Sequence, residues 1–115
     1  MIKVYQISLS APEMRLVELE GWEASPKIRA YAQKSVGRLF KVESLRFYEL
    51  VAEVDAVDLE EAFKLMNLWE EPEKVRKLKM RVPSMSVGDV LEMDGDLYRV
   101  ASFGFDKLEG AKVPA

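Results

Sequence analysis

The chain has 115 residues, 49% of them hydrophobic and 32% charged, as expected of one folded domain rather than a disordered or fibrous protein. It contains no cysteine and no histidine, which excludes disulfides, thiolate metal sites, cysteine nucleophiles and histidine-based catalytic triads. Its 17 basic and 20 acidic residues nearly balance, so bulk charge does not indicate a polyanionic partner.

Residues 2–9 are predicted to form a strand, because β-branched and aromatic residues occur there without a turn former. The pattern breaks in residues 10–24, which contain Pro12, Gly21 and scattered glutamates. We predict a loop there, with room for a short strand over residues 15–19.

A helix is predicted from Pro26 to about Phe40. Ser25 suits the N-cap, and Pro26 suits the first helical position. Apolar residues recur at helical spacing and define a buried face. A second, basic stripe comprises Lys27, Lys34, Arg38 and Lys41. It fits a solvated face, a nucleic-acid contact or a contact for an acidic protein.

Residues 45–54 alternate between apolar and polar side chains and are predicted to form a strand with one wetter face. A second helix follows, with Asp58 as N-cap, Glu61 completing a capping box, and an end near Glu70. Trp69 falls on the buried stripe of this helix. The helix start explains the local acidic cluster, so no metal site is assigned to Asp55, Asp58, Glu60 and Glu61.

Residues 71–82 form the most irregular stretch, with a short strand predicted over residues 77–82. Five basic residues gather in it: Lys74, Arg76, Lys77, Lys79 and Arg81. Loops held at both ends by rigid elements often contact partners. We therefore assign these five residues as candidate partner-binding residues, with a solvated linker as the alternative.

A β-hairpin is predicted over residues 87–103, because two alternating apolar runs flank Asp94 and Gly95. A two-residue turn at this pair places Met93 opposite Asp96. One hairpin face is then predicted to be core and contains Leu91, Met93, Tyr98 and Val100. The other face is predicted to be wetter and contains Val90, Glu92, Leu97 and Arg99.

These elements predict one α+β domain over residues 1–106, a small mostly antiparallel sheet with two helices packed on one face. The last residues, 107–115, contain little apolar surface and are predicted to fray. No apolar run reaches the roughly 20 residues of a membrane span, and the first residues do not resemble a signal peptide. We expect a cytoplasmic protein without a membrane partner.

The segment from Ser84 to Asp89 invites a catalytic interpretation, because Ser84, Ser86 and Asp89 lie close together. Without histidine a serine there lacks an evident base, so Ser86 and Asp89 are predicted to bond nearby backbone instead. Phe103 and Phe105 flank Gly104, and core packing is predicted for them over base stacking. No catalytic residue, metal or cofactor is assigned, and we expect no enzymatic activity.

Three phrases carry a family resemblance: L-E-E-A-F-K-L-M-N at 59–67, S-M-S-V-G-D-V at 84–90 and Y-R-V-A-S-F-G-F at 98–105. With the opening I-K-V-Y-Q-I, they resemble small proteins with the YodL-like domain, which occur largely in phages, prophages and conjugative elements. The resemblance covers about half of the chain. It implies the genomic setting of an accessory protein of a mobile element and does not imply an enzymatic activity.

Two functions fit these observations. The first is a non-catalytic phage or mobile-element accessory protein that binds a host or element protein, as host-takeover and anti-defence factors do. The alternative is a nucleic-acid-binding accessory protein that uses the basic residues of the first helix together with the basic segment 74–81.

Overall fold

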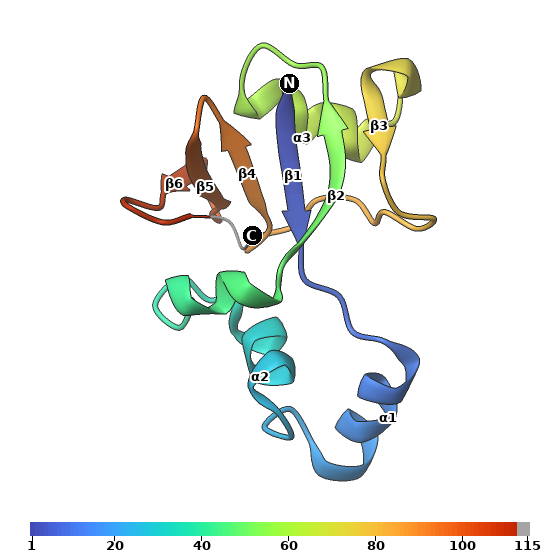
Figure 1. The fold of residues 1–115 in the computed structure, drawn as a ribbon, viewed down its shortest axis with the longest axis vertical. Coiled ribbons are helices and arrows are strands. Elements are labelled where there is room, and N and C mark those ends of the chain that lie inside the picture. Colours follow the sequence, from blue (N-terminus) through green and yellow to red (C-terminus); the bar gives the residue numbers. More distant parts are fainter. Residues whose placement is uncertain (113–115) are drawn as a thin grey trace.

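The computed structural model describes residues 1–112, which form an antiparallel six-stranded sheet with helices around it (Figure 1). The strands are β1 (Ile2–Gln6), β2 (Glu49–Val54), β3 (Val75–Lys77), β4 (Val90–Met93), β5 (Asp96–Val100) and β6 (Phe105–Lys107). The helices are α1 (Ala11–Glu20), α2 (Pro26–Gln33) and α3 (Leu59–Leu68), with 3-10 turns η1 (Val42–Phe47) and η2 (Pro72–Lys74). The predicted α+β class with an antiparallel sheet is confirmed.

The first strand in sequence lies in the middle of the sheet. The strand order is β3-β2-β1-β4-β5-β6, and each neighbouring pair is antiparallel. Figure 1 shows β1 between β2 and β4, with α3 against the sheet and the α1–α2 segment extending away from it. A central position agrees with the apolar character of β1 on both of its sides.

One face of the sheet packs against α3. Its centre is formed by Val4 of β1 and Leu91 of β4, which lie opposite each other and are fully buried. Ala62 and Met66, one turn apart on α3, belong to the same core. The N-cap predicted for this helix is confirmed, since the N–H of Glu61 donates to Oδ1 of Asp58 at 2.9 Å. The second bond of the predicted capping box is not formed, because Oε1 of Glu61 accepts from the N–H of Val57 at 3.1 Å and not from that of Asp58.

The opposite face is also covered, over β1, β4 and β5. Val90 and Leu97 are buried there in a second core, to which α2 contributes Ala30 and η1 contributes Leu45. The two helices expected together on one face are thus divided between the two faces of the sheet. The prediction of a wetter hairpin face was wrong for Val90, Leu97 and Arg99, which are all buried.

The hairpin register is confirmed. Met93 pairs with Asp96 and Leu91 with Tyr98, as a two-residue turn requires. Asp94 and Gly95 have φ angles of 54° and 84°, both in the left-handed region that a type I′ turn needs.

Several boundaries differ from the prediction. A helix, α1, replaces the loop expected over residues 10–24, and α2 ends at Gln33 instead of near Phe40. β3 overlaps the strand predicted over residues 77–82 only at Lys77, and the residues before β2 form η1. Trp69 is half-buried with a φ of 55° and ends α3, so it is only partly in the core.

The C-terminal segment is more ordered than expected as far as the structure describes it. Lys107 belongs to β6, and the N–H of Leu108 donates to the carbonyl of Leu97 at 2.8 Å. Ala111 packs against the second core. The predicted fraying from residue 107 is therefore wrong up to residue 111, and residues 113–115 lie outside the described part of the chain. Among residues 1–112 no helix is long and apolar enough to span a bilayer.

Candidate functional site

Helix α1 begins with a capping box at Ser10. Oγ of Ser10 accepts a hydrogen bond from the N–H of Glu13 at 3.3 Å, and Oε1 of Glu13 accepts one from the N–H of Ser10 at 2.8 Å. Pro12 lies in the first turn, where proline is tolerated, and Gly21 ends the helix with a φ of 86°. The Ser-x-x-Glu pattern was the sequence signal for α1, and Pro12 and Gly21, read as helix breakers, mark its two ends instead.

α1 stands apart from the sheet (Figure 1). Within the described chain none of its ten residues is buried, and Leu19 is 76% exposed. Pro12, Leu16 and Leu19 recur at i, i+4 and i+7, which aligns them on one side of the helix. They line an open hollow of about 360 Å³ on α1.

An isolated helix of ten residues is marginal in water, so α1 needs support from outside its own hydrogen bonds. One support is the ion pair between Nζ of Lys27 on α2 and Oε1 of Glu13, at 3.0 Å. The hydrogen bond from the Ser10 N–H, followed by Lys27, lowers the pKa of the Glu13 carboxyl. The cap and the ion pair thus hold α1 in place, while Pro12 and Leu19 on its apolar side stay exposed and Leu16 is partly buried.

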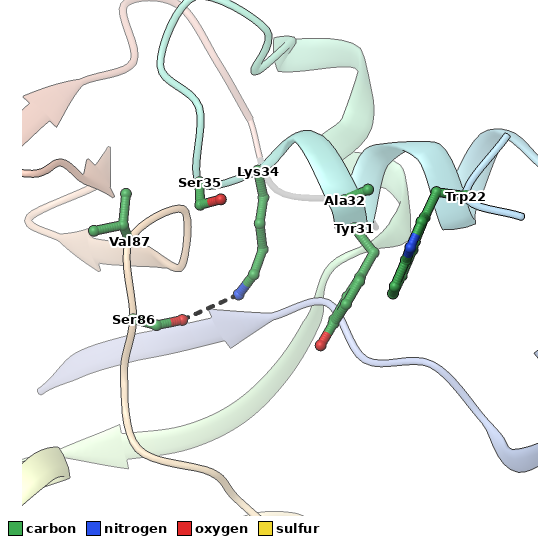
Figure 2. A pocket seen from close by; sticks show the side chains of 7 residues that line it. All are labelled: Trp22, Tyr31, Ala32, Lys34, Ser35, Ser86 and Val87. Atoms are coloured by element: carbon green, nitrogen blue, oxygen red, sulfur yellow. Dashed lines mark hydrogen bonds between the residues drawn. The ribbon is translucent and has the colours of Figure 1, made fainter. Parts of the chain in front are cut away.

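A cavity of about 640 Å³ lies between α2 and the loop that precedes β4 (Figure 2). One side is aromatic, because the rings of Trp22 and Tyr31 stack with centroids 6.2 Å apart and planes within 9°. The other side is polar, and Figure 2 shows Lys34 extending toward Ser86 across the cavity. A second cavity of about 260 Å³ reaches Met14 of α1 and shares Tyr31, Lys34 and Ser86 with the first.

The polar wall is built on a buried ion pair. Nζ of Lys34 lies 2.6 Å from Oδ1 of Asp89, whose side chain is only 2% exposed, and 3.3 Å from Oγ of Ser86. Oδ2 of Asp89 accepts hydrogen bonds from the N–H of Ser86 at 3.0 Å and from Nε2 of Gln6 at 3.1 Å. Both carboxylate oxygens are therefore satisfied, as a buried charge requires.

The end of α2 and the loop are also in close backbone contact. Arg99 donates from Nε and Nη2 to the carbonyl of Lys34, at 3.2 and 2.7 Å. A Cβ atom at Gly88 would lie 2.4 Å from that same carbonyl oxygen, and Gly88 has a φ of 95°. Glycine is thus required by both space and backbone conformation. At the C-cap of α2, the carbonyl of Lys34 is thus satisfied by Arg99 and not by a further helical N–H.

The arrangement suits binding better than nucleophilic catalysis. Ser86 faces the Lys34 amine, a geometry that could resemble an activated hydroxyl. However, Lys34 is the cation of an ion pair with Asp89 and donates to Ser86, so it is not placed to accept the hydroxyl proton. The predicted bonding to nearby backbone is confirmed for Asp89, which accepts from the N–H of Ser86, but not for the Ser86 hydroxyl, which accepts from Lys34. The role of Lys34 was missed, because 55 residues separate it from Asp89.

The four basic residues of the first helix do not form one stripe. Lys27 pairs with Glu13, and Lys34 turns inward to Asp89. Arg38 and Lys41 follow the end of α2. The four basic residues predicted to contact nucleic acid therefore do not share one face of a helix.

The candidate basic segment, residues 74–81, lies along and beyond the edge strand β3. Three of its residues form ion pairs with acids of the same chain: Lys74 with Glu71, Arg76 with Glu53 and Lys79 with Glu49. Lys77 lies over the Trp69 ring at 4.5 Å, and Arg81 is exposed. Charged side chains on an edge strand also discourage pairing with other chains, which is a structural role.

The two phenylalanines of the C-terminal hairpin differ in their surroundings. Phe105 packs edge-to-face on Phe63, with centroids 6.4 Å apart. Phe103 is 95% exposed, so the prediction of core packing was wrong for this residue. It lies at the tip of the turn between β5 and β6, where no second layer covers it among the described residues.

Comparison with known proteins gave no match: no protein-family model, no curated protein and no solved structure is significantly similar to this chain.

Proposed function

We propose that this protein is a non-catalytic binding protein that presents α1 to an apolar groove on a partner protein. The observation that carries the proposal is that α1 buries none of its residues within the described chain, although Leu16 and Leu19 align on one side. Helices that bind in grooves insert apolar side chains that are three, four or seven positions apart, and α1 has this spacing. Arg15 lines the same hollow, so an acidic side chain at the groove rim would complement it.

The neighbouring cavity supports the same function. Trp22 lies two residues after the end of α1 and is 46% exposed, so the partner surface that receives α1 can extend over the Trp22–Tyr31 stack. Exposed aromatic side chains of this kind often anchor protein interfaces. The pairing of Lys34 with Asp89 is a further reason to propose a binding role over a catalytic one.

The biological setting is proposed from the sequence. The resemblance of residues 59–67, 84–90 and 98–105 to YodL-like domain proteins favours an accessory factor of a phage or another mobile element. We propose a cytoplasmic host or element protein as its partner. The nucleic-acid alternative is less favoured, because Lys27 and Lys34 have carboxylate partners within the chain.

Residues 74–81 are the second candidate contact surface, because Lys77, Lys79 and Arg81 are exposed at one edge of the sheet. The two surfaces can be compared in one capture experiment. Tagged protein is incubated with nuclease-treated host lysate, and bound protein is identified and quantified. The variants are Leu16→Ser with Leu19→Glu on α1, and Lys74, Lys77 and Lys79 together changed to glutamate.

If α1 is the contact, the α1 variant loses the stoichiometric partner while the triple glutamate variant retains it. Val57→Glu is the matched control, since Val57 is an exposed apolar residue outside both candidate surfaces. If the α1 variant still captures the partner and the triple glutamate variant does not, the contact surface is residues 74–81. Loss of all bound material on nuclease treatment of the wild type would instead support nucleic acid.

A further inference from the structure

The turn between β5 and β6 projects an aromatic side chain into solvent. Phe103 is 95% exposed, in a turn closed by a hydrogen bond from the N–H of Ala101 to the carbonyl of Gly104 at 3.0 Å. Gly104 has a φ of 68°, which suits glycine and allows this tight turn. Phe103 is therefore held on a closed turn of the sheet. Covering its exposed ring would remove apolar surface from water, which is favourable.

A hollow of about 310 Å³ lies beside this turn and includes Ser102 and Gly104 in its wall. Its apolar lining comes from Val100, Phe63 and Phe105. This volume is in the range of cavities that hold small ligands, so it has room for a phenyl ring. Glu60 and Lys64 of α3 also line the hollow, and both are exposed.

We infer that a second copy of this chain covers this surface, with Phe103 of each copy in the hollow of the other. A two-fold interface places the same surface on both copies, so that surface must complement itself. This one does, because it contains a protruding ring beside an apolar hollow. It also contains one acid and one base, so Glu60 of one copy faces Lys64 of the partner subunit.

This surface comprises Phe103 and the eight residues that line the hollow, against roughly 20 to 30 residues a side in a standard protein interface. The dimer is therefore weak and forms as the concentration rises. It uses α3 and the β5–β6 turn and leaves α1 free, so it is independent of the partner binding proposed above. A dimer would present two α1 helices to a partner.

Sedimentation equilibrium of the full chain from about 5 µM to about 1 mM tests the inference, because this range brackets weak association. The wild type is expected to shift from monomer to dimer. Phe103→Ser is expected to raise the dissociation constant by at least about tenfold, as loss of an aromatic anchor does. Met80→Ser is the control, because Met80 is also a fully exposed apolar residue. It is expected to leave the dissociation constant of the dimer unchanged.

Charge reversal tests the two-fold arrangement. Glu60→Lys and Lys64→Glu are each expected to weaken the dimer, since each places like charges opposite one another twice. The double variant is expected to restore it, and the melting temperature of each variant reports whether the monomer is folded. A wild type that stays monomeric throughout, a dimer insensitive to Phe103→Ser, or a folded double variant that does not dimerise would each overturn the inference.

Discussion

Lys34 and Asp89 form an ion pair of 2.6 Å that joins the end of α2 to the loop before β4. The two residues are 55 positions apart in the chain, and Asp89 is the more deeply buried of the two. The pair fixes the α1–α2 segment on the sheet, and with it the Trp22–Tyr31 stack. The cavity beside this stack thus depends on an ion pair that forms part of its own wall.

Replacing Asp89 with asparagine is expected to lower the free energy of unfolding by about 3 kcal/mol, because it leaves Lys34 largely buried without a counter-charge. The comparison is Lys79→Gln, which removes an exposed pair with Glu49 and should cost about 1 kcal/mol or less. Urea denaturation measures both values. Equal losses in the two variants would contradict the structural role of the Lys34–Asp89 pair.

Gly88→Ala and Gly95→Ala separate backbone strain from steric overlap. Both glycines have positive φ, so an alanine at either costs about 1 to 2 kcal/mol. Only at Gly88 does the added Cβ meet the carbonyl of Lys34, which adds about 1 to 3 kcal/mol of overpacking. We expect Gly88→Ala to be clearly the less stable variant in thermal unfolding. The same melting temperature for both would refute the close approach.

Ser10→Ala and Asp58→Ala remove the same kind of helix cap from two different settings. Each cap contributes about 1 kcal/mol. Asp58 caps α3, which is packed in the first core, so its loss should reduce the global stability. Ser10 caps α1, so its loss should speed amide exchange in α1 about fivefold without changing global unfolding. A drop in global stability with Ser10→Ala would show that α1 unfolds together with the sheet.

Acid should loosen α1 through Glu13. The pKa of this carboxyl is lowered from its ordinary 4.5 by the Ser10 N–H first and by Lys27 next. A lowered pKa stabilises the folded form above pH 4.5, and this stabilisation is lost as the pH falls through the folded-state value. Chemical shifts of α1 amides between pH 7 and pH 3 should report that loss. The transition should be absent in Glu13→Gln, and its persistence there would assign it to another group.

Local signals in the sequence were sufficient for the hairpin and for α3. Asp94 and Gly95 determine the turn and therefore the register, and Asp58 with Glu61 determines where α3 begins. Each of these features depends on residues within a few positions of one another. They could be predicted without knowledge of the rest of the fold.

The site depended on contacts that local signals do not contain. Arg99 looks like a surface residue in the alternating pattern of β5, but the carbonyl of Lys34 accepts its hydrogen bonds and makes burial possible. The helical periodicity after Gln33 likewise did not reveal that α2 ends there. Phe103 was expected in the core because alternation along a strand does not show where a turn leaves the sheet.

The central place of β1 has a consequence for the chain during its synthesis. Tyr5 lies opposite Leu50 on one side and Val90 on the other, so β1 is made before both of its neighbours and obtains the second one only after β4 has been made. Until then β1 has at least one open hydrogen-bonding edge, which other nascent chains can pair with. Slower translation would prolong this exposure, and aggregation during expression should then begin at the N-terminal strand.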